Sequence, residues 1–153
     1  FEQSYSGVDG DSASSTELYA ILSALSGKPI KQHIAVTGSV NQKGEVQAIG
    51  GVNEKVEGFY EVCKSKRLIG NEGCMIPYSN VQNLMLKEEL VTDIKEGRFH
   101  IWPVKTIDQG VEVLTGIDAG KLQPNGSYPE GTIHQIVQDR LDEMAELIKE
   151  FKL

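Results

Sequence analysis

Residues 34–65 read IAVTGSVNQKGEVQAIGGVNEKVEGFYEVCKS and are the most informative segment for the fold class. The apolar run at 34–40 predicts a strand, and 45–49 predicts a second strand that returns after a turn. A pair of glycines then breaks the chain, and the apolar spacing at 53–65 is typical of an amphipathic helix. A hairpin followed directly by a helix favours an α+β fold (α/β in the broad sense), in which helices pack on a mixed β-sheet.

Further elements of both kinds are expected on either side of this segment. The expected strands are 1–6, 74–77 and 100–104, and the expected helices are 14–26, one or two short helices within 79–96, and 106–115. Ser14, Ser15 and Thr16 can cap the start of the first of these helices, and Gly27 ends it. Pro77 lacks the N–H that a sheet interior needs, which predicts an edge strand or a proline at the strand end.

The C-terminal part of the chain predicts a helix behind a loop. Residues 117–131 contain Gly120, Pro124, Gly126, Pro129 and Gly131, which predicts a loop or linker between a domain at 1–116 and a helix at 132–153. Apolar residues recur four and three positions apart along this helix and are interrupted by Arg140. Two arrangements remain open: the amphipathic helix packs on its own domain, or it contacts a neighbouring subunit.

The composition excludes several classes of protein. The 153 residues include 15 Lys plus Arg and 22 Asp plus Glu, which gives a net charge of −7. Such acidity disfavours nucleic acid as the main partner, and no apolar run is long enough to predict a membrane span. Cys63 and Cys74 are too few for a disulfide framework and are typical of free thiols in a reducing cytoplasm. Since the chain starts at Phe1 and shows no secretion signal, we expect a fragment of a longer protein.

Lys55 is the only charged side chain within the apolar sector of the helix at 53–65. On a projection at ~100° per residue, it lies between Phe59 and Val62. Two outcomes are open. Either the aliphatic stem lies along apolar surface while the ammonium reaches water, or burial disfavours the charged form and leaves a neutral amine that can act as a general base.

Ser12 is the best candidate for a nucleophile beside such a base. It follows a loop with two glycines and directly precedes the helix expected at 14–26. Unpaired backbone N–H groups at a helix N-terminus favour negative charge and can serve as an oxyanion hole in acyl transfer. The competing interpretation is that Ser12 is an ordinary helix cap.

Taken together, these segments resemble the proteolytic domain of the Lon proteases over most of the chain, from about Val8 to Gly116. The matching segments are 9–14 (Asp-Gly-Asp-Ser-Ala-Ser), 35–40, 44–55, 76–77 and 102–104, which resemble in turn the nucleophile motif, the following strand, the segment ending at the catalytic lysine, and two later strands. Several ordered motifs at compatible spacing are a more specific signal than any one of them.

The resemblance implies a serine peptidase with a Ser-Lys dyad. By position, Ser12 is the nucleophile, Lys55 the general base, and Thr37 the threonine that hydrogen-bonds near the amine. The backbone N–H groups of Asp11, Ser12 and Ala13 would hold the oxyanion. Asp11 stands where the family usually has proline, as in the LonB-like branch, and it either holds the Lys55 amine or points to solvent.

The resemblance also implies partners outside this chain. ATP and Mg would bind an AAA+ module N-terminal to it, no cofactor or metal is expected within it, and His33, His100 and His134 share no metal-ligand spacing. The family implies a hexameric ring that cuts unfolded polypeptides in the cytoplasm. The alternative is a non-proteolytic accessory or assembly domain of an ATPase, and a weaker one is a Ser-Lys hydrolase of small amides.

Overall fold

The computed structural model describes residues 10–151, so the strand expected at 1–6 lies outside the described residues. In order, the elements are α1 (Ser14–Ser26), β1 (Ile34–Val36), β2 (Ser39–Val40), β3 (Val46–Gln47), α2 (Val52–Ser65), β4 (Gly73–Pro77), the 3₁₀ helix η1 (Tyr78–Asn83), α3 (Glu88–Lys95), β5 (His100–Val104), α4 (Ile107–Thr115) and α5 (Ile133–Phe151). Every helix expected within these residues is confirmed, and 79–96 contains two short ones.

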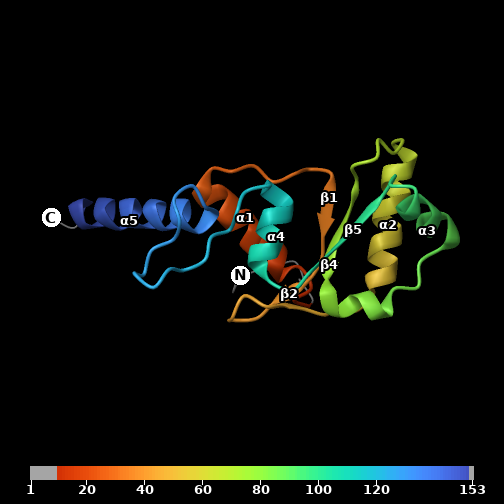
Figure 1. Ribbon diagram of the computed structural model, residues 1–153, viewed down its shortest axis with the longest axis horizontal. Coiled ribbons are helices and arrows are strands. Elements are labelled where there is room, and N and C mark those ends of the chain that lie inside the picture. The colour runs from red at the N-terminus through yellow and green to blue at the C-terminus, as the bar shows by residue number, and fades with distance from the viewer. Residues whose placement is uncertain (1–9, 152–153) are drawn as a thin grey trace.

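A parallel three-stranded sheet with the order β1-β4-β5 forms the centre of the molecule. Helices α2 and α3 lie on one side of this sheet, and α1 and α4 lie on the other (Figure 1). Successive side chains of β4 point to opposite faces of the sheet, because side chains alternate along a strand. Cys74 and Ile76 belong to the apolar cluster under α2, whereas Met75 belongs to the cluster under α1 and α4. The predicted α+β class is confirmed.

The prediction of one continuous strand at 34–40 is wrong, because the strand is interrupted between β1 and β2 and the chain then enters a different sheet. Gly38 lies at the break with φ +151°, and a Cβ there would lie 3.0 Å from a methyl group of Val46. The crowding explains why this position takes glycine. The hairpin itself is confirmed, since β2 pairs antiparallel with β3, but the returning strand contains only Val46–Gln47 rather than 45–49.

Pro77 closes β4, as the strand-end alternative requires, but β4 is the central strand and not an edge. The N–H of Gly73 donates to the carbonyl of His33, so the alternate positions of β4, Pro77 included, face β1. Pairing between β1 and β4 ends at Met75. Within residues 10–151, no strand pairs with β4 on the β1 side beyond Met75, so Pro77 interrupts no strand pairing there.

The serines at the start of α1 do not act as helix caps. Ala13 occupies the N-cap position without a side-chain hydrogen bond. Instead, the Ser15 hydroxyl donates to the carbonyl of Gly38 at 2.7 Å, and the Ser14 hydroxyl accepts from the N–H of Val40 at 3.1 Å. These hydroxyls bind α1 to the segment 37–40 between and into the two strands, here called the β1–β2 crossing, because that backbone runs beside the helix.

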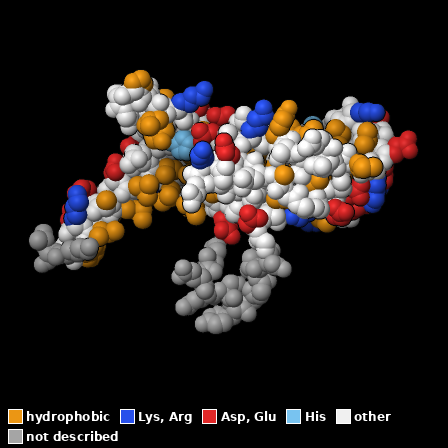
Figure 2. Space-filling view, turned by 90° about the horizontal axis from the view of Figure 1, so that it is seen from below, with side chains coloured by type: hydrophobic (Ala, Val, Ile, Leu, Met, Phe, Trp, Pro, Cys, Tyr) orange, Lys and Arg blue, Asp and Glu red, His pale blue; other side chains and the backbone are white. Residues whose placement is uncertain are grey.

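Helix α5 is buried only at its beginning. Ile133 and Val137 join the apolar cluster of α1 and α4, whereas the later apolar positions Leu141, Met144, Leu147, Ile148 and Phe151 are exposed. Figure 1 shows α5 extending away from the sheet, and Figure 2 shows apolar side chains gathered along one side of it. Residues 117–132 contain neither helix nor strand. The first turns thus pack on their own domain, and contact with a neighbouring subunit stays a prediction.

Candidate active site

Ser12 lies in the loop before α1 and is half-buried. Two groups at the β1–β2 crossing hold its carbonyl oxygen. The N–H of Gly38 donates to it at 2.8 Å, and the hydroxyl of Thr37 donates to it at 3.4 Å. The backbone of the candidate nucleophile is therefore fixed to the sheet. The side chain of Ser12 does not cap α1, in contrast to the local interpretation of the sequence.

Lys55 approaches Ser12 from the first turn of α2. Its Nζ lies 3.0 Å from the Ser12 hydroxyl oxygen, although the two residues are 43 positions apart in the sequence. This distance is within the range of a normal hydrogen bond. It is also within the range required for proton transfer between a nucleophile and a general base.

Of the two outcomes left open for Lys55, the structure favours the one in which the side chain reaches water, because Lys55 is exposed. The buried stripe of α2 consists of Val52, Val56, Tyr60 and Cys63. This stripe is narrower than the apolar sector seen in the sequence, and Val62, beside Lys55 on the projection, is 49% exposed. Lys55 lies on the open flank of the helix, which corresponds to the alternative in which the ammonium reaches water.

Asp11 and Thr37 take positions beside the pair without bonding to the lysine. Asp11 is exposed, and its carbonyl accepts the N–H of Ser14 at 2.9 Å. Within residues 10–151, no ion pair joins Asp11 to Lys55, and the Thr37 hydroxyl bonds to Ser12 rather than to the amine. The structure therefore favours the interpretation in which Asp11 points to solvent.

The N–H groups expected to hold an oxyanion belong to Asp11, Ser12 and Ala13. Among the described residues, none of the three donates a hydrogen bond to another backbone group. They lie directly before the first turn of α1, where the helix dipole favours negative charge. N–H groups in such a position can donate hydrogen bonds to a carbonyl oxygen on which negative charge develops under attack.

A cavity of about 320 Å³ opens beside these groups. Its lining residues are Ser12, Ala13, Ala35, Val36, Thr37, Lys55, Val56 and Cys74. The lining combines the hydroxyl and the amine with small or β-branched apolar side chains, which is the usual composition of a ligand site. Burial raises the pKa of the Cys74 thiol to about 12, so this cysteine stays protonated at neutral pH and is a poor nucleophile.

Two asparagines near the site were missed by the sequence analysis. Asn80 in η1 accepts the N–H of Ile49 at 2.9 Å and donates to the carbonyl of Ile49 at 3.0 Å. Asn53 in α2 donates to the carbonyl of Asn83 at 3.0 Å and accepts the N–H of Met85 at 2.8 Å. Contacts of an amide with a distant backbone leave no periodic pattern in a sequence, so no local signal identifies them.

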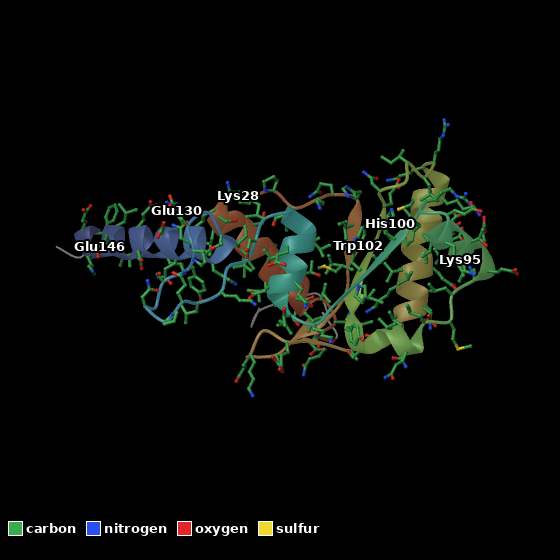
Figure 3. The ribbon with its side chains drawn as sticks, in the orientation of Figure 1. Lys28, Lys95, His100, Trp102, Glu130 and Glu146 are labelled. Carbon is green, nitrogen blue, oxygen red and sulfur yellow. The ribbon has the colours of Figure 1, made fainter. Side chains whose placement is uncertain are left out.

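The histidines take part in contacts outside the cavity. His100 contacts the carbonyl of Gly70 at 2.8 Å and stacks near Trp102 on β5 (Figure 3), and His134 pairs with Asp108 at 2.7 Å. In the described part of the chain, no three His, Cys, Asp or Glu side chains are grouped so that they could hold a metal ion. No helix there is long and apolar enough to cross a bilayer.

Comparison with known proteins points to one family. Residues 6–116 match the family model of the Lon protease (S16) C-terminal proteolytic domain. A putative Lon protease homolog of Escherichia coli is 50% identical over 117 residues, which cover 76% of this chain and 20% of that protein.

Two other relatives agree with this match. A putative Lon protease homolog of Haemophilus influenzae is 42% identical over 95% of this chain and 24% of that protein. An archaeal Lon protease of Thermococcus kodakarensis is 39% identical over 74% of this chain and 16% of that protein. The chain thus spans a quarter or less of the length of these relatives, and it belongs to the family of Lon protease C-terminal proteolytic domains.

Proposed function

We propose that this domain is the serine endopeptidase unit of an ATP-dependent Lon-like protease, with Ser12 as nucleophile and Lys55 as general base. The observation that carries the proposal is the 3.0 Å contact between the Lys55 amine and the Ser12 hydroxyl, two residues that line the same cavity. A nucleophile within hydrogen-bond distance of a base is the arrangement that covalent catalysis requires.

Acylation would begin with neutral Lys55. The Ser12 oxygen attacks the carbonyl carbon of a peptide bond as its proton passes to the Lys55 amine. The carbonyl oxygen becomes an oxyanion facing the N–H groups of residues 11–13. Lys55 then returns the proton to the departing amine, which leaves an ester on Ser12. Water, deprotonated by the same amine, hydrolyses this ester and restores the serine.

Substrate itself would help to prepare the base. The Lys55 side chain is exposed, and water stabilises the charged form of an amine. A peptide that fills the cavity between Lys55 and the apolar wall at Ala35 and Val56 displaces that water. Removal of water would favour the proton transfer from Ser12 at the point where substrate is bound.

The proposal for the whole protein extends beyond this chain. ATP and Mg²⁺ would bind an AAA+ module elsewhere in the protein, and a cytoplasmic, hexameric ring would deliver unfolded polypeptides to the cavity. These statements rest on the family resemblance. The net charge of −7 supports protein rather than nucleic acid as the substrate.

Labelling with a fluorophosphonate tests the dyad. The reagent should modify wild-type protein at Ser12, as located by mass spectrometry of peptides, and Ser12→Ala should abolish the modification. Lys55→Met should slow labelling at least about 100-fold, because a general base contributes roughly 10²–10⁴-fold. Lys66→Met, which removes an exposed lysine at the other end of α2, is the matched control and should label as wild type.

The full-length protein distinguishes the alternatives. ATP-dependent cleavage of casein that disappears in Ser12→Ala is the result expected of an endopeptidase. ATP hydrolysis without cleavage of any unfolded protein, together with equal labelling of wild type and Lys55→Met, would identify an accessory or assembly domain instead. Cleavage restricted to small amides would identify a hydrolase of a different substrate class.

A further inference from the structure

The first turn of α2 is not fixed by a helix cap. Gly51 occupies the N-cap position with φ +67° and offers no side chain to the free N–H groups of the helix. Lys55 belongs to this turn, since its N–H donates to the carbonyl of Gly51 at 3.1 Å. An uncapped helix end frays readily unless other contacts hold it, so the position of the Lys55 backbone depends on what anchors the segment around residue 51.

Asn80 provides one such anchor. Only 3% of its surface is exposed, and its side chain pairs with both the N–H and the carbonyl of Ile49, two residues before the N-cap. The carboxamide thus acts like a short piece of neighbouring strand for a loop that lacks one. Buried hydrogen bonds of this kind are costly to break because the donor and the acceptor would remain unpaired away from water.

Asn53 provides a second anchor on the other side of the N-cap. Its side chain bonds to the carbonyl of Asn83 and the N–H of Met85. Both asparagines therefore connect the start of α2 to the same segment, η1 and the residues just after it. One connection precedes the N-cap and the other follows it, so the first turn of α2 is held at both sides.

The nucleophile is anchored to a different part of the fold. The carbonyl of Ser12 is held by Gly38 at the β1–β2 crossing, whereas the backbone that carries Lys55 is held by η1. The 3.0 Å contact between their side chains therefore depends on two independent sets of bonds. A displacement of about 1 Å in such a pair can cost on the order of 100-fold in rate.

We propose that Asn80 is a positioning residue for Lys55, and that Asn53 has the same role from the surface. Neither asparagine touches the reacting atoms, and each acts by fixing the turn from which the amine reaches Ser12. This inference rests on the proposed function, because it assigns the hydrogen bonds of the two asparagines a role in the Ser12–Lys55 reaction.

The test is a double-mutant cycle on the fluorophosphonate labelling rate. Asn80→Ala should slow the labelling of Ser12 at least about tenfold in the wild-type background, while the final labelled fraction still approaches one per chain. In the Lys55→Met background, Asn80→Ala should cause no further loss, because residues that act through one group are not additive. Asn53→Ala should show the same pattern with a smaller effect, since its bonds are exposed.

The controls separate positioning from folding. Gln82→Ala changes an exposed residue of the same 3₁₀ helix and should label as wild type. A variant that is only less folded labels more slowly in proportion to its folded fraction. Circular dichroism reports that fraction directly, so a tenfold loss of rate in a variant that is still mostly folded reports positioning. If Asn80→Ala does not fold, Asn53→Ala alone decides the outcome.

The inference and the proposed function fail in different ways. Equal rate losses from Asn80→Ala in the wild-type and Lys55→Met backgrounds would overturn the positioning role, as would unchanged labelling in both asparagine variants. Failure of Lys55→Met to slow the reaction, or absence of labelling in the wild type, would instead overturn the dyad.

Discussion

Helices α2 and α5 have the same kind of sequence pattern but a different degree of burial. Both carry apolar residues three and four positions apart. In α2 the resulting stripe, Val52, Val56, Tyr60 and Cys63, is buried along the whole helix. In α5 only Ile133 and Val137 are buried, and the stripe ends at Phe151 with 89% of that side chain exposed.

A periodic apolar stripe therefore predicts a helix but not how much of that stripe is buried. Helix α2 lies on the sheet and beside α3, so each turn meets a neighbour. Helix α5 extends away from the sheet (Figure 1), and the apolar residues of its later turns are exposed. Burial, and not pattern, sets the free energy that each apolar side chain contributes.

The largest expected effect is on the buried stripe of α2. Tyr60→Ala should lower the free energy of unfolding by about 3–5 kcal/mol, as removal of a buried aromatic side chain does. Tyr60 packs edge-to-face on Phe99 at 5.4 Å and donates to Asp93 at 2.7 Å. The measurement is urea denaturation of this variant and of Phe151→Ala, whose free energy of unfolding should be near that of wild type. A loss below about 1 kcal/mol for Tyr60→Ala would contradict the difference in burial between the two helices.

A somewhat smaller effect is expected within α5 itself. Ile133→Ala should cost about 2–4 kcal/mol, because Ile133 is fully buried in the cluster of α1 and α4. The measurement is again the urea midpoint, with unchanged slope. Similar costs for Ile133→Ala and Leu141→Ala would contradict the division of α5 into a covered and an open part.

Acid should lower the free energy of unfolding mainly through the carboxylate of Asp93, which packs beside α2, and little through the exposed carboxylates of α5. The Tyr60 hydroxyl and then the Arg98 guanidinium hold the pKa of Asp93 below its ordinary value of about 3.9. A lowered carboxyl pKa stabilises the fold above the ordinary value, and this contribution is lost as pH falls below about 4 through the folded-state pKa.

Asp93→Asn therefore removes the acid-dependent part of stability. It should cost about 1.5–3 kcal/mol at neutral pH, the range for hydrogen bonds to a charged group, and its urea midpoint should change less than that of wild type between about pH 5 and pH 2.5. Glu146→Gln is the control, because the Lys149–Glu146 pair on α5 is exposed and contributes little. Parallel pH profiles for wild type and Asp93→Asn would count against the assignment.

The smallest effect is expected on the open end of α5. Leu147→Gln should change the free energy of unfolding by no more than about 0.5 kcal/mol, since half of this side chain is exposed. A larger loss together with a urea midpoint that rises with protein concentration would show that another copy of the chain covers this stripe in solution.

The helices of residues 10–151 and both residues of the candidate dyad can be predicted from the sequence. The helix periods at 14–26, 53–65 and 106–115 are local properties, and the structure has them within one residue. Sequence reasoning failed where long-range contacts decide. It missed the break at Gly38, which depends on a side chain of β3, and it placed serine caps on α1 where hydroxyls bind the β1–β2 crossing.

Periodicity and motif spacing run along the chain, so the type and order of most elements, the family resemblance and the two residues of the candidate dyad can be predicted without coordinates. The exposure of Lys55, the hydrogen bonds of Asn80 to the turn before it and the 3.0 Å contact of the amine with the hydroxyl appear only in the folded chain. Burial and hydrogen bonding need a partner, and here the partner comes from a distant part of the chain.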